Sequence, residues 1–467
     1  MRLTFLGAAG TVTGSRFAVT SDVDPASPET MLVDCGLFQG PREIRERNWA
    51  PFTLNPAEIS AVVISHAHLD HCGYLPALVR DGFTGPIYCS PNSAQLIPII
   101  LRDSAKLQEE DTAYARRKGF SRHAEPRPLY DSVDAEAAIG LLVPREFGTT
   151  IHLTPHLSCV LEPAGHILGS STVTITEKQN DSSKRLIFSG DLGRSNHPLL
   201  DSPTPPENPD AIVIESTYGD RDHPDFDAEI DEMAAAITRT LKRGGTVVIP
   251  AFAVDRTEVL LTTLRRLQDQ HRIPIAPIAV DSPMALAALR VYLNAISDQD
   301  EEITTAAIAE GADIIDLPNL SEAHSAEQSK HLDTGGPRII VSASGMATGG
   351  RVTHHLKAFL PDHNSCVILA GYQAVGTTGR MLADGAREVK IHGRYVPVHA
   401  EIVKVDAFSV HADRDELIDW IASANPLPSQ VFIVHGEPDA SAALAEEIHR
   451  KLDIPAIAPE PEETVVI

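Results

Sequence analysis

A chain of 467 residues can bury a large core and is long for one compact domain, so we expect two domains. Hydrophobic residues make up 43% and charged residues 22%, the proportions of a globular protein, and the apolar runs are too short to cross a membrane. The net charge of −25 argues against a general nucleic-acid binder, because phosphate contacts need Lys and Arg. A metal centre or a local basic strip could still supply positive charge on such a chain.

The five cysteines are scattered, odd in number and contain no Cys-x-x-Cys pair. They are Cys35, Cys72, Cys89, Cys159 and Cys366. This pattern favours a reducing, cytoplasmic setting over a disulfide framework. We interpret Cys35 and Cys72, which lie beside predicted site residues, as small packing residues.

The N-terminal residues 1–10 could be mistaken for a short signal peptide, but they lack a convincing cleavage site. We predict instead a first strand that runs into a Gly-rich turn. Residues 30–33 form a second apolar run, which ends at Asp34. Taken alone, Asp34 is as well explained by the capping of a turn as by a role in a site.

Three histidines and one aspartate follow the Val/Ile-rich run 59–64, which reads as a buried strand. They are His66, His68, Asp70 and His71. Imidazole and carboxylate are the usual ligands of zinc and similar divalent metals. The alternation of His66 and His68 lets two imidazoles point the same way from an extended backbone, so that Asp70 and His71 suit a second metal. The stretch therefore predicts a metal site at the end of a strand.

Residues 94–105, with Ser93 as a possible N-cap and Pro98 near the start, and residues 113–118 both resemble helices. Basic side chains occur along this region. They are Lys106, Arg116, Arg117, Lys118 and Arg122. Such a run is more often a solvated face than a binding surface.

The arrangement of a strand that ends in a ligand-type residue recurs three times. His166 follows residues 159–161, Asp191 follows the apolar run 186–188, and Glu215 follows residues 211–214. His166 alone would more often be a core histidine than a ligand. In layered α/β folds, however, sites form at the C-terminal ends of strands.

After Glu215 strands and helices alternate, which indicates a mostly parallel α/β unit over residues 209–388. We predict strands at 246–249, 278–281, 338–341 and 366–370, and helices at 228–243, 256–268, 283–296 and 350–360. Residues 298–336 are polar and are predicted to be loop-like. Ligand-type residues return after 390: His411 precedes a short helix near Asp413, and His435 ends the strand 430–434. The chain is therefore predicted to divide into a first domain (1–208), an inserted domain (209–388) and a returning segment of the first (389–467).

Together these motifs resemble the metallo-β-lactamase superfamily and, within it, the β-CASP branch of nucleases. The superfamily elements are Asp34, the signature His66-x-His68-x-Asp70-His71, His166, Asp191 and His435. The β-CASP elements are Glu215 in Glu-Ser-Thr-Tyr-Gly, His411 in Phe-Ser-Val-His-Ala-Asp, and His435 in Val-His-Gly-Glu. The implied fold is α/β: a four-layer αβ/βα sandwich with an inserted α/β β-CASP domain.

The resemblance implies two zinc ions per chain. One would be held by His66, His68 and His166, the other by Asp70, His71 and His435, with Asp191 bridging. Asp34 would orient the site, as such carboxylates do for metal ligands. Glu215 and His411 would act on the substrate beside the metals, although His411 could instead merely cap the helix that follows. In this family a histidine at the His435 position goes with RNA cleavage.

Loops of the inserted domain also resemble those that line the family's substrate-binding region. The residues concerned are Ser342, Ser344, Gly345, Thr377, Thr378 and Arg380. Small hydroxyl side chains and glycine amides can hold phosphate without a large positive charge. Each loop could equally be an ordinary junction between a strand and a helix.

The resemblance therefore implies a zinc-dependent ribonuclease that cuts single-stranded RNA internally and also has exonuclease activity. We expect it to be cytoplasmic and to have no membrane partner, and the sequence leaves open whether it forms a homodimer. One alternative is a metallo-hydrolase of DNA or of a small ester; the inserted domain argues against the small ester. Another is a non-catalytic binding partner, which the full set of ligand-type residues argues against.

Overall fold

The computed structural model describes residues 1–24, 26–118, 126–179, 182–315 and 317–467. The chain forms two compact units: unit 1 comprises Met1–Asp222 and His411–Ile467, and unit 2 comprises His223–Val410. These limits differ from the boundaries at 208 and 388 that the sequence suggested. The reason is that β11 (Ala211–Ile214) pairs with strands of unit 1, whereas β19 (Glu401–Val405) pairs with β16 (Cys366–Ala370) of unit 2.

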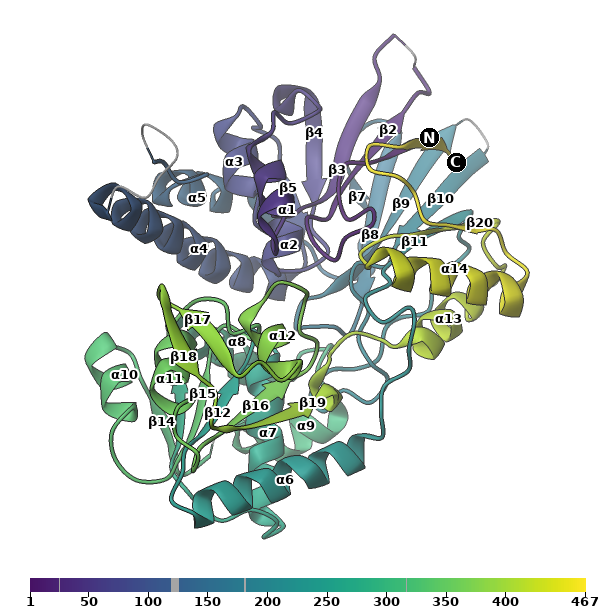
Figure 1. Ribbon diagram of the computed structural model, residues 1–467. Coiled ribbons are helices and arrows are strands. Elements are labelled where there is room, and N and C mark those ends of the chain that lie inside the picture. The colour runs from purple at the N-terminus through teal and green to yellow at the C-terminus, as the bar shows by residue number, and fades with distance from the viewer. Residues whose placement is uncertain (25, 119–125, 180–181, 316) are drawn as a thin grey trace. The chain divides into compact units, whose positions relative to one another are not determined.

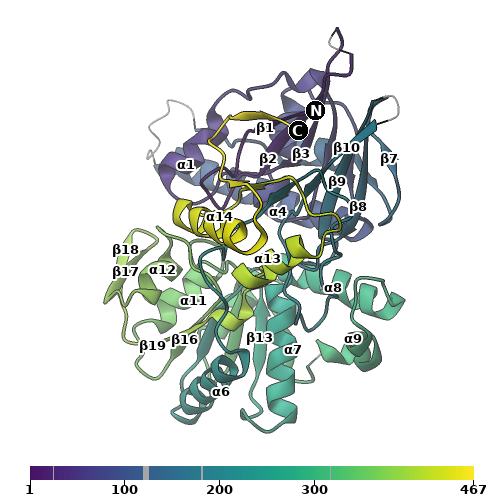
Figure 2. The same ribbon diagram turned by 90° about the vertical axis from the view of Figure 1, so that its right-hand side faces the viewer.

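Unit 1 contains two seven-stranded sheets. In spatial order, the first consists of β22 (Thr464–Val466), β1 (Arg2–Phe5), β2 (Arg16–Ser21), β3 (Glu29–Cys35), β4 (Ile59–Val63), β5 (Ile87–Cys89) and β6 (Leu142–Pro144). The second consists of β21 (Ala456–Ile457), β20 (Gln430–Ile433), β11, β10 (Ser182–Phe188), β9 (Ser171–Gln179), β8 (Leu157–Pro163) and β7 (Ile151–His152). Because β1 pairs with β22, the two termini lie side by side (Figure 1, Figure 2).

The core of unit 1 lies between these sheets and is dominated by aromatic side chains from both. Phe5 and Phe17 of the first sheet lie 6.2 Å apart between ring centroids. Phe432 of the second sheet lies 5.5 Å from Phe5, and Phe188 lies 5.5 Å from Phe17. Tilted and edge-on pairs at these distances are favourable, so the aromatic rings join the two sheets into a sandwich.

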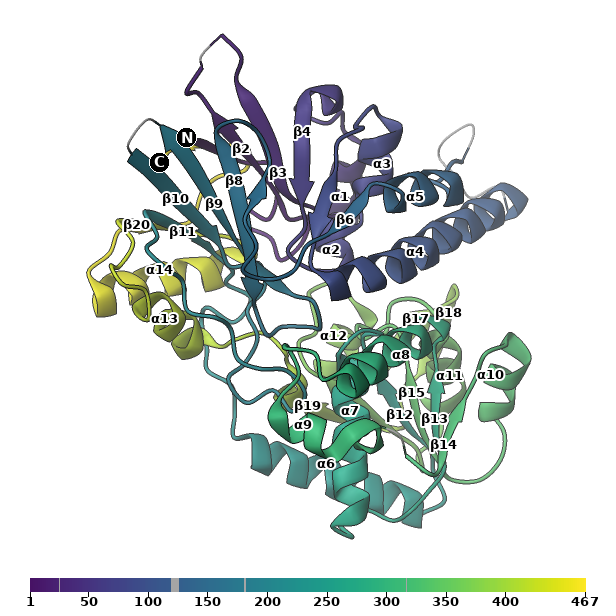
Figure 3. The same cartoon turned by 180° about the vertical axis from the view of Figure 1, so that it is seen from behind.

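Helices cover the outer faces of both sheets. The helices of unit 1 are α1 (Arg42–Glu46), η1 (Arg47–Trp49), η2 (Pro56–Glu58), α2 (Leu69–Cys72), α3 (Leu75–Arg80), α4 (Pro91–Lys118), α5 (Ser132–Ile139), α13 (Arg414–Ala422) and α14 (Pro438–Leu452). On the first sheet α3, α4 and α5 pack together and α4 contacts β6, while α14 contacts β20 and β21 of the second (Figure 3). The predicted αβ/βα layering is confirmed.

One helix replaces two that the sequence suggested in this layer. Residues 94–105 and 113–118 both belong to α4, a continuous helix of 28 residues that contains Pro98. Ser93 is not its cap, because its Oγ donates to the carbonyl of Gly169 at 2.7 Å, and its N–H donates to Oγ of Ser90. A proline inside a helix costs about 3 kcal/mol, which burial of apolar side chains such as Leu101 along α4 offsets. Of the basic run, Arg122 lies outside the described residues.

Unit 2 is built on a six-stranded sheet in which every neighbouring pair is parallel, as the alternation of strands and helices predicted. Its order is β14 (Leu320–Glu322), β13 (Ile278–Asp281), β15 (Ile339–Ser342), β12 (Val247–Pro250), β16 and β19, and β17 (Glu388–Ile391) and β18 (Arg394–Pro397) form a separate hairpin. The helices are α6 (Phe226–Lys242), α7 (Arg256–Asp269), α8 (Pro283–Asp298), α9 (Thr305–Glu310), η3 (Gly311–Ile314), α10 (Ala326–Leu332), α11 (Val352–Phe359), α12 (Thr378–Ala383) and η4 (Asp406–Phe408).

The prediction that residues 298–336 are loop-like is wrong, because α9, β14 and α10 lie there. The polarity that suggested a loop reflects exposure: β14 is the edge strand of its sheet and two of its three residues are exposed. The start of α10 is fixed by a capping box between Ser325 and Gln328 rather than by an apolar face. None of the helices in the described ranges is both long and apolar enough to cross a bilayer.

Candidate metal centre

Ligand-type side chains of unit 1 converge from strand ends that are far apart in the sequence. His66 and His68 follow β4, and Asp70 and His71 lie in the short helix α2 (Leu69–Cys72). His166 follows β8, Asp191 follows β10 and His435 follows β20. The structure thus brings together all seven residues that the sequence singled out as metal ligands.

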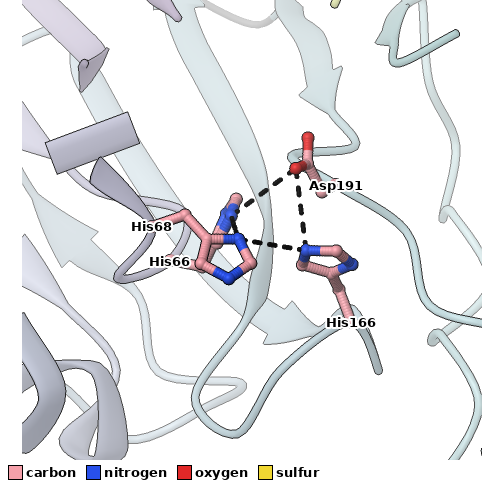
Figure 4. A group of neighbouring side chains, drawn as sticks. All are labelled: His66, His68, His166 and Asp191. Atoms are coloured by element: carbon pink, nitrogen blue, oxygen red, sulfur yellow. Dashed lines mark hydrogen bonds and ion pairs between the residues drawn. The ribbon is translucent and has the colours of Figure 1, made fainter. Parts of the chain in front are cut away.

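The first group comprises His66, His68, His166 and Asp191, whose potential ligand atoms all lie within 4.8 Å of one another (Figure 4). Nε2 of His66 lies 3.1 Å from Nδ1 of His68, and Nε2 of His166 lies 3.3 Å from the same atom. Oδ2 of Asp191 lies 3.6 Å from Nε2 of His66 and 3.7 Å from Nε2 of His166. Three ring nitrogens and one carboxylate oxygen therefore face one point.

The second group comprises Asp70, His71 and His435. Nε2 of His435 lies 3.3 Å from Nε2 of His71 and 3.5 Å from Oδ2 of Asp70. The other oxygen of Asp191, Oδ1, lies 3.4 Å from Nε2 of His71 and 3.5 Å from Nδ1 of His435. Asp191 thus belongs to the first group through Oδ2 and lies beside the second through Oδ1, although toward His435 the near atom is Nδ1 and not the Nε2 that faces His71 and Asp70.

These separations fit a cation of the size of zinc. Four ligand atoms about 2.0–2.1 Å from a tetrahedral zinc lie about 3.3 Å from one another, close to the separations in both groups. Nδ1 of His68 faces two other ring nitrogens but offers only one N–H or one lone pair, so it cannot form a good hydrogen bond to both, whereas three lone pairs suit a shared cation. The donor set of imidazole and carboxylate is one that zinc, iron and manganese accept.

Burial and neighbouring charges prepare several of these groups for metal binding. Burial lowers the pKa of His68 to about 4, and burial together with His71 lowers the pKa of His66 well below its usual value. Both imidazoles are therefore neutral at pH 7, the form that binds a metal. Burial raises the pKa of Asp191, but His435 and His71 lower it by more, so this carboxyl is ionised.

Three further side chains hold the ligands in place. Asp34, at the end of β3, accepts hydrogen bonds from the Ser65 N–H at 2.7 Å and the Ser65 hydroxyl at 2.8 Å, and lies 2.8 Å from Nδ1 of His71. These contacts hold the His71 ring in place, so the Asp34 carboxylate does more than cap a turn. Ser65 and Thr217 were not predicted to have a role; Oγ1 of Thr217 lies 3.3 Å from Nδ1 of His435. The only sequence signal for either is its position beside a predicted site residue.

Glu215 and His411 form a pair next to both groups. Nδ1 of His411 lies 3.0 and 3.1 Å from the two carboxylate oxygens of Glu215, and 3.9 Å from Oδ2 of Asp191. Glu215 is fully buried, whereas the His411 side chain is 16% exposed. The helix α13 is capped by Asp413 through a capping box, so His411 is not needed for that purpose.

The predicted substrate-binding residues lie in unit 2, at the C-terminal end of β15, in the loop that follows it and at the start of α12. The Ser342 hydroxyl donates to the carbonyl of Asp281, and the Thr377 hydroxyl caps α12. Arg380 pairs with Asp384 at 3.0 Å. Thr378, in the first turn of α12, is buried. Gly345 packs so closely on Phe252 that a Cβ there would lie 2.7 Å from the ring.

All five cysteines are free thiols and are buried. Burial raises the pKa of Cys35 to about 12, so this residue is an uncharged thiol and a poor metal ligand. Cys72 lies in α2, where its thiol donates to the carbonyl of Ala67. Both are packing residues, as predicted.

A substitution at Gly36 tests how tightly the Asp70–His71 segment is held. A Cβ at Gly36 would lie 1.6 Å from the backbone oxygen of Asp70 and 2.7 Å from the backbone nitrogen of His71, so this segment must move. We expect Gly36→Ala to weaken metal binding by roughly 10–100-fold, the usual effect of disturbing the support of ligands. Metal titration followed by elemental analysis measures this, and Gly336→Ala, where a Cβ meets nothing within 4 Å, is the matched control. Unchanged metal affinity in Gly36→Ala would mean that the segment adapts freely.

Three family descriptions match successive parts of the chain. The Metallo-beta-lactamase superfamily matches residues 28–251, the Beta-Casp domain residues 257–382, and the Zn-dependent metallo-hydrolase RNA specificity domain residues 395–459. The last match contains both His411 and His435. The chain belongs to the β-CASP branch of the metallo-β-lactamase superfamily, a family of metallo-hydrolases.

Among its relatives is "Ribonuclease TTHA0252" of Thermus thermophilus, 36% identical over 96% of this chain and 95% of the relative. "Transcription termination factor FttA" of Methanocaldococcus jannaschii is 30% identical over 96% of this chain and 69% of the relative. The protein of the same name from Pyrococcus horikoshii is 31% identical over the whole of this chain and 71% of the relative.

Proposed function

We propose that this chain is a zinc-dependent ribonuclease that hydrolyses phosphodiester bonds of single-stranded RNA, as an endonuclease with additional exonuclease activity. The observation that carries the proposal is the position of His435. This residue lies within the matched RNA specificity domain and is also part of the His/Asp cluster of unit 1. A relative that is similar over nearly its full length is named a ribonuclease, which supports the same activity.

In this proposal two metal ions share the cluster. His66, His68 and His166 hold one, Asp70, His71 and His435 hold the other, and Asp191 contributes to both through its separate oxygens. The ions would lower the pKa of a water and offset the charge that develops on the phosphate. The tetrahedral spacing of the ligand atoms supports zinc over larger cations. Asp34 keeps His71 in position through Nδ1.

The Glu215–His411 pair serves the leaving group. A leaving oxygen needs a proton, and histidine is the side chain best tuned to donate one near neutral pH. Glu215 holds Nδ1 of His411, so the ring is fixed and we propose that the proton is passed from Nε2. Asp70 acts beside this pair as a ligand, so its catalytic contribution is made through the metal it holds.

Loops of unit 2 are proposed to hold RNA phosphates through Ser344, Gly345 and the start of α12. This rests on their resemblance to the family and on the small side chains of these loops. The hydroxyls of Ser342 and Thr377 are hydrogen-bonded within the unit, so their contribution is to shape the loops. We place the enzyme in the cytoplasm, in keeping with five buried, free thiols.

The test combines metal content with substrate choice. Purified protein should contain about two divalent ions per chain, zinc first, and should cleave end-labelled single-stranded RNA but not DNA of the same sequence. Fragment lengths distinguish internal cuts from stepwise removal, and light scattering on the same sample shows whether a homodimer forms. Protein with both metals that leaves RNA intact would refute the proposal, and cleavage of DNA in place of RNA would favour the alternative of a metallo-hydrolase of DNA.

The acidity of the chain leads to a prediction on salt. We expect the affinity for RNA to fall with rising salt, but with a shallow slope. The chain has 39 Lys and Arg against 64 Asp and Glu, so few cationic side chains are available to contact phosphates. Binding of labelled RNA to the His411→Ala variant, which is expected to keep its metals and to cleave slowly, gives the slope when it is measured at several salt concentrations. Affinity independent of salt would contradict phosphate recognition, and a steep slope would give the basic residues of α4 a larger role.

A further inference from the structure

Asp281 of unit 2 is hydrogen-bonded to residues at both ends of one glycine-rich loop. The loop runs from β15, which ends at Ser342, to α11, which begins at Val352. At its start the Ser342 hydroxyl donates to the carbonyl oxygen of Asp281 at 2.9 Å. At its end Nη1 of Arg351 donates to Oδ1 of Asp281 at 2.6 Å. One aspartate at the end of β13 therefore fixes where the loop leaves the sheet and where it enters the helix.

His355, in the first turns of α11, extends this arrangement. Its Nε2 lies 2.7 Å from Oδ2 of Asp281, and its Nδ1 lies 2.6 Å from Oδ1 of Asp333, which follows α10. A carboxylate can only accept a hydrogen bond, so both ring nitrogens donate and the ring is an imidazolium. Burial lowers the pKa of His355, but the bonds to Asp281 and Asp333 raise it by more, to about 8.

The network is fully buried at its centre, which makes its charge balance important. The side chains of Asp281 and His355 are both inaccessible to solvent. Ser329 also donates to Oδ2 of Asp281, so both oxygens of this carboxylate are engaged. Buried charges that lose a partner are strongly destabilised, so removal of one member should disturb the others.

The first half of the loop has contacts of its own, since Nε2 of Gln373 donates to the carbonyl of Gly345 and the Gly379 N–H donates to that of Met346, whereas its second half, residues 348–350, is exposed. The loop contains Gly345, Gly349 and Gly350, and a Cβ at Gly349 would meet nothing within 4 Å. Glycine backbones are costly to order, so a loop of this composition depends on anchors at its ends. The loop also carries Ser344 and Gly345, two of the residues assigned above to phosphate binding.

We propose that Asp281 and His355 are positioning residues that hold the loop 343–351 in the conformation that binds RNA. This inference rests on the proposed ribonuclease function. Both residues belong to unit 2, and neither is part of the His/Asp cluster of unit 1. Substituting either residue should therefore raise the KM for RNA. The KM for a small diester such as bis(p-nitrophenyl) phosphate, whose hydrolysis needs only the metal centre, should stay unchanged.

Because His355 is protonated, the positioning role predicts a pH dependence of the KM for RNA. A merely structural role would not produce this pH dependence. The pKa is higher in the folded protein than in the unfolded chain, so the contribution is complete below about pH 6.5 and is lost as pH rises through about 8. The charged groups around the ring are Asp281, Asp333 and Arg351, with His354 and Lys357 on its own helix. The ratio of the KM for RNA to that for the small diester should rise as pH passes 8.

The experiment compares His355→Gln and Asp333→Ala with wild type in the full chain. His355→Gln should raise the KM for RNA roughly 10-fold at pH 7, the affinity equivalent of one lost charged hydrogen bond, with little change for the small diester. The Asp333 side chain is 24% exposed, so Asp333→Ala leaves no buried cavity. This variant provides the test if His355→Gln does not fold. Asp333→Ala should shift the rise in the KM ratio to lower pH. His331→Gln, an exposed histidine on α10, is the matched control.

The outcomes separate the two proposals. If wild type cleaves RNA but both folded variants keep the wild-type KM and pH profile, the positioning role is refuted and the ribonuclease stands. If the variants lose activity on both substrates in parallel, the network supports the fold in general and the positioning role is again refuted. If wild type with both metals does not cleave RNA at all, both proposals fall.

Discussion

Replacing His411 with alanine is expected to leave fold and metal content intact and to lower RNA cleavage by roughly 10²–10⁴-fold, the usual contribution of a general acid. The reason is geometric. His411 is absent from every group of ligand-type residues in the described chain, yet its Nδ1 lies 3.9 Å from Oδ2 of Asp191 and its ring centroid lies 4.5 Å from that of His166. It is therefore beside the metal centre without being needed to fill it.

Glu215→Gln should be impaired through the same step. The Glu215 carboxylate is held by the Leu192 N–H at 2.8 Å, so it keeps the His411 ring in one orientation. Glutamine retains the shape but loses the charge that pairs with the protonated ring. Because Glu215 also forms a group with Asp191 and His435, metal content must be measured in this variant as well.

Single-turnover cleavage of labelled RNA and elemental analysis of the same preparation measure these effects together. His152→Ala, at an exposed position of β7, is the control for loss of an imidazole far from the site. A His411→Ala protein with both metals and nearly normal cleavage would refute the acid role. Loss of metal in His411→Ala would instead make this residue part of the metal shell.

The sequence carried most of the information about the candidate centre because its residues stand at the ends of recognisable strands. Apolar runs predict β4, the end of β10 and β11, and the acidic or histidine residues that follow them are therefore expected at the C-terminal ends of strands. The two sheets then bring these ends together. His435 could be assigned only through the resemblance, since nothing local connects it to residues 66–71.

The contacts that the sequence could not reveal join residues that carry no local pattern. Asp281 and His355 are 74 positions apart, and nothing in either segment, a strand end and a turn of a helix, indicates that the two side chains pair. Their pairing depends on the packing of α11 against the sheet, which is a tertiary event. The same holds for α4. This helix continues past Pro98, which locally disfavours a helix, because its side chains are buried against neighbouring elements.

Removal of Asp191 should have the largest effect of any single substitution in the site. Its Oδ2 faces His66 and His166, while its Oδ1 faces His71 and His435, so Asp191→Ala removes an oxygen from both groups at once. It also leaves the surrounding imidazoles without the buried charge that balances a cation. We expect Asp191→Ala to lose both metals and to lower cleavage by on the order of 10⁴-fold or more, because metal activation and charge stabilisation disappear together.

His68→Ala separates the two groups, because His68 belongs only to the first. This variant should lose one metal more readily than the other, and elemental analysis at graded zinc concentrations would show a retained ion of higher affinity. For Asp191→Ala the matched control is Asp201→Asn, which removes an exposed carboxylate ten residues after Asp191. If Asp191→Ala kept two ions per chain, the carboxylate would not be shared between the groups, and each metal would have to be held by its own histidines alone.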